Sequence, residues 1–212
     1  MKLILCDERP LVLDAWRDQF QLRPEVEIRK DDVLHTPADA FLLPGNSFGF
    51  LDSGLELRAL EAHGWEVQDE LRQRIQSEYD GELLVGQALI YRRPSMPRAM
   101  VYAPLWRTPR RLSGTSHVFL LVRGALLAVT KEANVLGGNG GIQSLAIPGL
   151  GVDSGEMHPI ISARQARYAY EIAMGLRGRG DKSLNQLRRQ EKKLQTLPEL
   201  GKEKETARED EG

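Results

Sequence analysis

The chain has 212 residues, of which 41% are hydrophobic and 28% are charged, and its formal net charge at pH 7 is −1. This length and composition suit one domain with an appendage and supply enough apolar residues for a core without crosslinks. The near-zero charge argues against nucleic acid as the main partner, because neutralising phosphates needs a basic surface. The single cysteine, Cys6, lies in the apolar run LILC and excludes an internal disulfide.

The sequence also argues against a membrane protein and a metal site. No stretch approaches the roughly 20 consecutive apolar residues of a membrane span. The first residues, MKLILCDERP, lack the long apolar segment of a secretory signal. The histidines, His35, His63, His117 and His158, are scattered without the spacing of metal ligands. We therefore expect a cytoplasmic protein with no membrane partner, no metal and no cofactor.

The predicted elements begin with the apolar run KLILC, which indicates a strand, followed by the capping residue Asp7 and by Pro10, which suits a first helical turn. Apolar spacing then predicts a helix over residues 11–20. Beyond it, strand-like and helix-like segments follow one another: strands in VEIRKDDV and ADAFLLP, helices in LELRALEAHGW and EVQDELRQRIQSEYD, strands in LLVGQALIYR and AMVYAPLW, a helix in SHVFLLVRGALLAVTKEAN, a strand in SLAIPGLG and a helix in PIISARQARYAYEIAMG. This alternation predicts a three-layer α/β domain with a largely parallel central sheet.

The composition changes after residue 176. Residues 177–212 contain no aromatic side chain and few apolar ones, so this segment buries too little surface to offset the entropy of ordering it. We expect a domain over residues 1–176 and a charged tail that is disordered or partly helical. Four leucines that fit one side of a short helix make the tail a candidate docking element for an unknown partner: Leu184, Leu187, Leu194 and Leu197.

Two glycine-rich loops follow predicted strands. PGNSFGFLDSG follows the strand that ends at Leu43, and PGLGVDSG follows the strand that ends at Ile147. In an open α/β sheet, ligands bind where loops leave the carboxyl ends of strands. Glycine lets backbone N–H groups approach a phosphate, so the second loop resembles a phosphate cradle. Neither a Walker GK[ST] nor a GxGxxG after the first strand is present, and such loops can also be simple tight turns.

The segment DDVLHTPADAFLLPGNSFGFLDSGLE resembles the signature of the macrodomain family, also called Appr-1-p processing proteins. Asp32-Val33 occupies the position of the family's Asp-Ile pair, and Asn46 occupies that of its strand-closing asparagine. GELLVGQALI and IPGLGVDSGEMHP resemble a later strand and the second phosphate loop, and the similarity covers residues 25–175. The resemblance implies a macrodomain-like three-layer α/β/α sandwich with a mixed, largely parallel sheet. It also implies a protein that binds ADP-ribose, which some members hydrolyse from proteins or nucleic acids.

The resemblance also implies roles for particular residues. Asp32 would take the adenine amino group beside the Val33 backbone, Asn46 would bind the distal ribose, and glycines would let the backbone wrap the ribose and diphosphate. The implied ligand-binding residues are Asp32, Val33, Gly45, Phe48, Gly49, Phe50, Gly54, Pro148, Gly149, Leu150, Gly151, Val152 and Gly155. Other uses stay open: Asp32 can cap a turn, Asn46 can satisfy loop backbone, and Phe48 and Phe50 can pack as core or lid. His158 is a further candidate phosphate contact.

Hydrolysis at the anomeric carbon of ADP-ribose needs a held water and a group that orients or deprotonates it. The resemblance implies Asn46 and Glu56 for these tasks, with Asp52 as a substitute acid. Glu56 can equally be a first-turn acid that the helix dipole stabilises. The family's earlier asparagine is replaced here by Leu43, and FGFLDS interrupts its glycine run. These departures favour binding over turnover.

Three functional hypotheses follow. The first is an ADP-ribosyl hydrolase, and the second is a non-catalytic ADP-ribose reader. Their partner would be ADP-ribose or an ADP-ribosylated target, with nucleic acid only where it carries ADP-ribose. The third is a Rossmann-like nucleotide or methyl-donor enzyme, which the strand-Asp-helix opening LILCDERPLVLDAW suggests.

Overall fold

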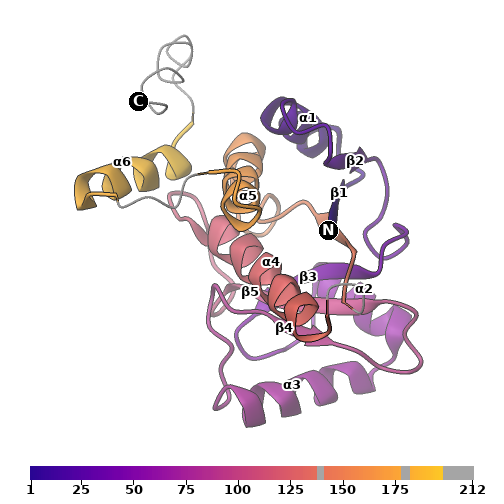
Figure 1. Cartoon of the computed structure of the whole chain (residues 1–212). Coiled ribbons are helices and arrows are strands. Elements are labelled where there is room, and N and C mark those ends of the chain that lie inside the picture. The colour runs from indigo at the N-terminus through magenta and orange to yellow at the C-terminus, as the bar shows by residue number, and fades with distance from the viewer. Residues whose placement is uncertain (138–140, 178–181, 198–212) are drawn as a thin grey trace.

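The structure is a computed structural model, and it describes residues 1–137, 141–177 and 182–197. These residues form a six-stranded sheet in the order β2-β1-β6-β3-β5-β4 (Figure 1). The strands are β1 Lys2–Cys6, β2 Glu27–Arg29, β3 Ala40–Asn46, β4 Leu89–Tyr91, β5 Ala99–Trp106 and β6 Ser144–Pro148. β4 pairs with β5 antiparallel, and the other pairs are parallel. The predicted mixed, largely parallel sheet is confirmed.

Helices cover both faces of the sheet, which gives the three predicted layers. They are α1 Pro10–Phe20, α2 Gly54–His63, α3 Glu66–Glu78, α4 His117–Val135, α5 Pro159–Ala173 and α6 Leu184–Gln195. One core cluster unites α1, α4 and α5 with one face, and a second unites α2 and α3 with the other. Figure 1 shows α3 and α5 on opposite sides of the strands. No helix in the described ranges is long and apolar enough to cross a membrane.

Strand β3 shows why the central strands are apolar on both sides. Ala40 and Leu42 belong to the first core cluster, whereas Phe41 and Leu43 belong to the second. Neighbouring side chains of a strand point to opposite faces, so a strand between two helical layers must be apolar at every position. The central strands can therefore be recognised in the sequence as continuous apolar runs.

Two predicted strands are shorter in the structure than in the sequence pattern. The segment VEIRKDDV keeps only β2, because the Asp32 carboxylate accepts the N–H of Leu34 and turns the chain. The segment LLVGQALIYR keeps only β4, because Gly86 has a left-handed φ of 99° that ends extended backbone before Leu89. Both strands are shorter than predicted because of local turns, which the spacing of apolar residues does not reveal.

The described part of the predicted tail contains α6, which begins with a capping box made by Ser183 and Gln186. Leu194 is buried, and its carbonyl accepts a hydrogen bond of 2.9 Å from the Gln165 side chain of α5. Leu184 and Leu187 are exposed. The predictions for residues 178–181 and 198–212 lie outside the described residues.

Candidate functional site

The two glycine-rich loops leave the same rim of the sheet. Strands β3 and β6 are parallel neighbours, so the loops that follow Asn46 and Pro148 both start at carboxyl ends. The β3–β6 ladder stops at Phe41↔Ala146, while β3 continues beside β5 to Asn46 and β6 continues beside β1 to Pro148. The two halves of the sheet diverge between the loops, and this switch point is where open α/β sheets bind ligands.

Asn46 folds the first loop upon itself. Its Oδ1 accepts the N–H groups of Phe48 at 3.0 Å and Phe50 at 3.3 Å, and its Nδ2 donates to the Phe50 carbonyl at 2.8 Å. The next N–H, that of Leu51, donates to the Gln68 side chain at 2.8 Å. The side chain of Asn46 therefore satisfies loop backbone, which is the alternative that the sequence left open. One N–H of its amide makes no hydrogen bond within the described part of the chain.

Glycine is required at different positions of the first loop for different physical reasons. Gly45 belongs to β3, and a side chain there would overlap the hydroxyl and ring of the fully buried Tyr102. That hydroxyl donates to the Asn46 carbonyl at 2.6 Å. Packing beneath the loop thus accounts for the glycine at position 45, and the ligand contact that the resemblance implied for it stays a prediction. Gly49 and Gly54 have left-handed φ values of 76° and 56°, which L-residues rarely adopt.

Two aromatic side chains of the first loop lie at the rim beside arginines. Phe50 is exposed, and the Arg72 guanidinium lies 4.1 Å from its ring centroid. Phe48 is half-buried, with the Arg107 guanidinium 5.0 Å from its ring centroid. Cation–π contacts of this kind hold rings in fixed orientations at a surface. The two phenylalanines are therefore placed as rim elements, with Phe50 facing solvent.

Glu56 is a half-buried acid that makes no hydrogen bond or ion pair to another residue of the described chain. Burial raises the pKa of its carboxyl to about 7, and the nearby charge of Asp52 adds to the effect. Burial also raises the pKa of Tyr102, with Glu56 as the next cause, which places the acid near that ring. A carboxyl that titrates near neutral pH can take or give a proton during catalysis.

Glu56 lies in the first turn of α2, where the helix dipole can stabilise its charge, as the alternative interpretation of the sequence proposed. Ser53, the N-cap residue, makes no side-chain capping hydrogen bond. The N–H groups of Gly54 and Leu55 find no acceptor in the part of the chain that the structure describes, so they are open to a ligand, as at anion-binding helix N-termini.

The second loop is fixed by its ends and carbonyls. The N–H of Gly149 donates to Asp7 Oδ2 at 3.1 Å, and the carbonyl of Leu150 accepts the Ser162 hydroxyl at 2.7 Å. The carbonyl of Gly151 accepts the Met157 N–H at 2.8 Å. By contrast, the N–H groups of residues 150–155 donate to no residue of the described chain. Uncommitted backbone N–H groups in a short loop are the donors with which proteins bind anions, so this loop is a candidate anion site.

The turn that holds Asp32 uses its polar groups internally. Asp32 Oδ1 accepts the N–H of Leu34 at 3.0 Å, and Oδ2 pairs with Arg58 of α2. Val33 is buried, and its carbonyl accepts Arg98 at 3.2 Å. Asp32 thus caps a turn, which is the alternative role that the sequence left open for it. An adenine amino group that binds Asp32 would have to replace Arg58.

The sequence pattern did not identify Asp7 and Arg9 as site residues. Asp7 was read as a helix cap, but Arg9 is the N-cap residue of α1, and Asp7 instead receives two side-chain hydrogen bonds from Arg9, at 2.8 and 2.7 Å. Burial acts to raise the pKa of Asp7, yet the hydrogen bonds from Arg9 and the Gly149 N–H outweigh it and hold that pKa below its usual range. Only the pairing of β1 with β6 brings Asp7 to the second loop, although its place at the end of an apolar strand was a usable signal.

Three further polar groups lie at or near this rim. The buried Ser47 hydroxyl and Trp106 indole N–H have no hydrogen-bond partner among the described residues, and they lie where β3 and β5 end. Such orphaned groups are uncommon in native structures. The ring of His158, a candidate phosphate contact, accepts the Ile160 N–H at 3.3 Å and caps α5.

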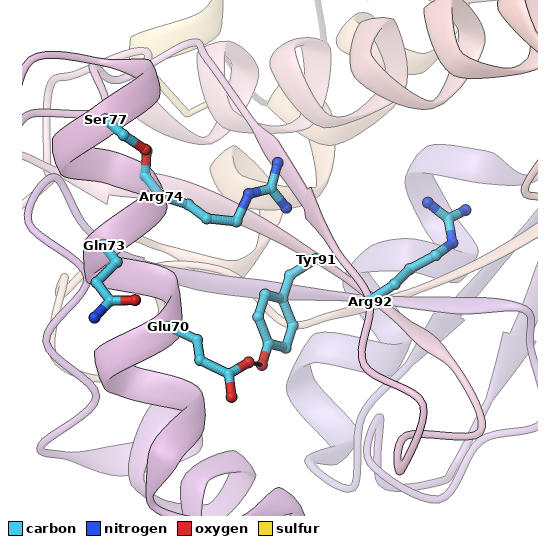
Figure 2. A pocket seen from close by; sticks show the side chains of 6 residues that line it. All are labelled: Glu70, Gln73, Arg74, Ser77, Tyr91 and Arg92. Carbon is cyan, nitrogen blue, oxygen red and sulfur yellow. Dashed lines mark hydrogen bonds between the residues drawn. The ribbon is translucent and has the colours of Figure 1, made fainter.

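Two surface pockets lie away from these loops. One of about 470 Å³ lies between α3 and β4 (Figure 2). Its polar side chains already have partners: Tyr91 donates to Glu70 within the pocket, and Arg74 pairs with Glu78 outside it. A second, of about 320 Å³, includes Arg98 at the amino-terminal rim. Neither pocket combines glycine backbone with an unpaired acid, so the carboxyl rim stays the stronger candidate.

Comparison with known proteins assigns the fold. No protein-family model matches the chain, and no curated protein matches it. Among solved structures, the macrodomain of Mycobacterium tuberculosis DarG aligns with 17% identity and a TM-score of 0.53 over 70% of this chain and 88% of that one. The macrodomain of Thermus aquaticus DarG aligns with 19% identity and a TM-score of 0.54 over 67% and 87%. The chain has the macrodomain fold.

A third solved structure, Thermosipho africanus DarTG in complex with ADP-ribose, aligns with 14% identity and a TM-score of 0.52 over 79% of this chain and 50% of that one. The predicted resemblance to macrodomains is thus confirmed as a likeness of fold. At these identities the likeness concerns the fold alone.

Proposed function

We propose that this macrodomain-fold protein binds ADP-ribose, free or attached to a target, at the carboxyl rim between its two glycine-rich loops. The observation that carries the proposal is the row of uncommitted N–H groups over residues 150–155, which suits a diphosphate. Solved structures of the same fold support the ligand. One is Thermosipho africanus DarTG in complex with ADP-ribose, and another is a mutant of the Oceanobacillus iheyensis macrodomain with ADP-ribose.

The proposed pose assigns each part of the ligand to an element. The diphosphate takes the N–H groups of residues 150–155, and the N-terminus of α2 supplies further donors at Gly54 and Leu55. The distal ribose lies against the loop that Asn46 shapes, with Phe50 at its solvent side. The adenine reaches the turn at Asp32, whose carboxylate exchanges the exposed Arg58 for the amino group.

We further propose hydrolysis of the bond between the distal ribose and a target. Glu56 accepts a proton from a water whose oxygen attacks the anomeric carbon, while the bond to the target breaks and its electrons leave with the target. The free N–H of Asn46 orients the ribose or the water, and Asp52 stabilises the positive charge that develops on the sugar. The raised pKa of Glu56 supports this role, because a base near pH 7 both accepts and releases a proton easily.

A non-catalytic reader is the second candidate, and one observation favours it. The amide of Asn46 makes three hydrogen bonds to its own loop. These bonds hold the amide in place and leave it one N–H for a substrate. A loop built in this way can shape a binding surface without placing a water at the anomeric carbon.

Isothermal titration calorimetry tests the binding proposal. We expect saturable one-to-one binding of ADP-ribose, weaker binding of ADP, and at least about tenfold weaker binding of adenosine, because charge-assisted hydrogen bonds to the phosphates are lost. The affinity should change little when α6 is disturbed by Leu194→Ala. No heat with ADP-ribose, together with tight binding of a methyl donor, would contradict the proposal and favour the third hypothesis.

A further inference from the structure

Arg9 connects the end of β1 to the second glycine-rich loop. Its guanidinium holds the Asp7 carboxylate through two hydrogen bonds, from Nε at 2.8 Å and from a terminal nitrogen at 2.7 Å. Its other terminal nitrogen pairs with Asp153, which lies within the second loop. The arginine therefore spans two carboxylates, one on the strand end and one on the loop.

The two carboxylates differ in how firmly they hold the arginine. The Asp7 side chain is 8% exposed and also accepts the backbone N–H groups of Arg9 and Gly149, so four hydrogen bonds fix its position. The Asp153 side chain is 78% exposed, and Arg9 is its only described ion-pair partner. An ion pair with one exposed partner contributes little to stability. Exchange of Asp153 for another anion therefore costs little.

The guanidinium lies directly against the backbone of the second loop. A side chain at Gly149 would overlap Asp7 Oδ2 and the Arg9 terminal nitrogen. The glycine thus lets the cation lie against the loop at Gly149, directly before residues 150–155. A planar guanidinium offers bidentate geometry to a phosphate, and an ammonium does not.

We propose that Arg9 is a phosphate-binding residue of this site and that Asp153 is its internal competitor. In the free protein Asp153 neutralises one edge of the guanidinium. When a nucleotide diphosphate settles on the second loop, a phosphate oxygen replaces the Asp153 carboxylate, while Asp7 keeps the guanidinium oriented. This inference rests on the proposed function, because it names a specificity residue of that same site.

Calorimetry with ADP-ribose on two single variants and their combination tests the exchange. Asp153→Asn removes the competitor and is expected to tighten binding about two- to fivefold, whereas a purely structural role for the pair predicts no gain. Arg9→Lys keeps the positive charge but loses the bidentate geometry of the guanidinium, so it should weaken binding of ADP-ribose about tenfold. In the double variant the gain from Asp153→Asn should disappear. Adenosine, which has no phosphate, should respond to none of these changes.

Glu156→Gln is the matched control. Glu156 is also an exposed acid and directly follows the second loop, but it pairs with Arg111 at 2.9 Å rather than with Arg9. Its removal should leave the ADP-ribose affinity within about twofold. Equal tightening by Glu156→Gln and Asp153→Asn would reduce the effect to general loop charge and overturn the inference. Weaker binding by Asp153→Asn would overturn it as well, since Asp153 would then contact the ligand itself.

The outcomes separate this inference from the proposed function. If wild-type protein binds ADP-ribose and Arg9→Lys binds it with the same affinity, the role of Arg9 is refuted and the binding function stands. Wild-type protein that binds no ADP-ribose refutes the function, and the role of Arg9 falls with it. Arg9→Lys could disturb the buried Asp7, so its unfolding midpoint is measured alongside. Asp153→Asn alters a solvent-exposed side chain and decides the question even where Arg9→Lys is unstable.

Discussion

Substitution of Glu56 by glutamine is expected to lower the release of ADP-ribose from a modified protein by about a hundredfold or more, the range that a general base contributes. Glutamine keeps the size and hydrogen-bonding capacity of the side chain but cannot accept the proton of the attacking water. The affinity for free ADP-ribose should stay within about threefold, because no binding contact in the proposed pose needs the charge. A single-turnover assay with ADP-ribosylated protein measures the rate.

The matched control for this prediction is Glu61→Gln. Glu61 is an exposed acid on the same helix, α2. Its substitution should leave the rate unchanged. In wild type the rate should rise with pH through about 7, as the Glu56 carboxyl loses its proton. An unchanged rate in the Glu56 variant would assign the protein to the reader hypothesis or to another base.

The same substitution is expected to stabilise the fold above neutral pH by about 3 kcal/mol. The folded protein raises the pKa of Glu56 from 4.5 to about 7. Below pH 4.5 both folded and unfolded states carry the proton, and the acid costs nothing. Between 4.5 and 7 the unfolded state loses its proton first, so stability falls as pH rises, and above 7 the full penalty of a buried charge applies.

Urea unfolding of wild type and the Glu56 variant at pH 5 and pH 8 measures this effect. The free energies of unfolding of the two proteins should differ by less than about 1 kcal/mol at pH 5 and should differ most at pH 8. The Glu61 variant should follow wild type at both pH values. A Glu56 variant that is equally or less stable at pH 8 would show that the carboxylate has a favourable partner in the folded state. A gain in stability with a loss of turnover is the signature of an acid held for function.

The layers and the location of the candidate site were predictable from the sequence because they depend on local patterns. Apolar runs alternate with helical periodicity, which indicates a largely parallel sheet. The loops after Leu43 and Ile147 each follow a strand. Parallel strands end on one rim, and so the loops had to meet there. The family resemblance rested on the same segments, and the likeness of fold to solved macrodomains agrees with it.

Contacts between distant segments could not be read from the sequence. Asp7 and Gly149 meet because β1 lies beside β6, an adjacency that no local pattern encodes. Gly45 makes room for Tyr102 from β5, so its need for glycine depends on the register of β3 with β5. The titration of Glu56 likewise depends on burial by the folded loop. Each of these features arises from tertiary packing rather than from residue type or spacing.

The central claim is that the second loop binds the ligand's diphosphate through its backbone N–H groups. The most direct test is to follow backbone amide chemical shifts by NMR during titration with ADP-ribose. We expect the largest downfield shifts for the amides of residues 150–155, with further changes at Gly54 and Leu55 and none at β4. Saturable binding whose largest shifts fall instead at the amino-terminal rim around Arg98 would contradict the claim.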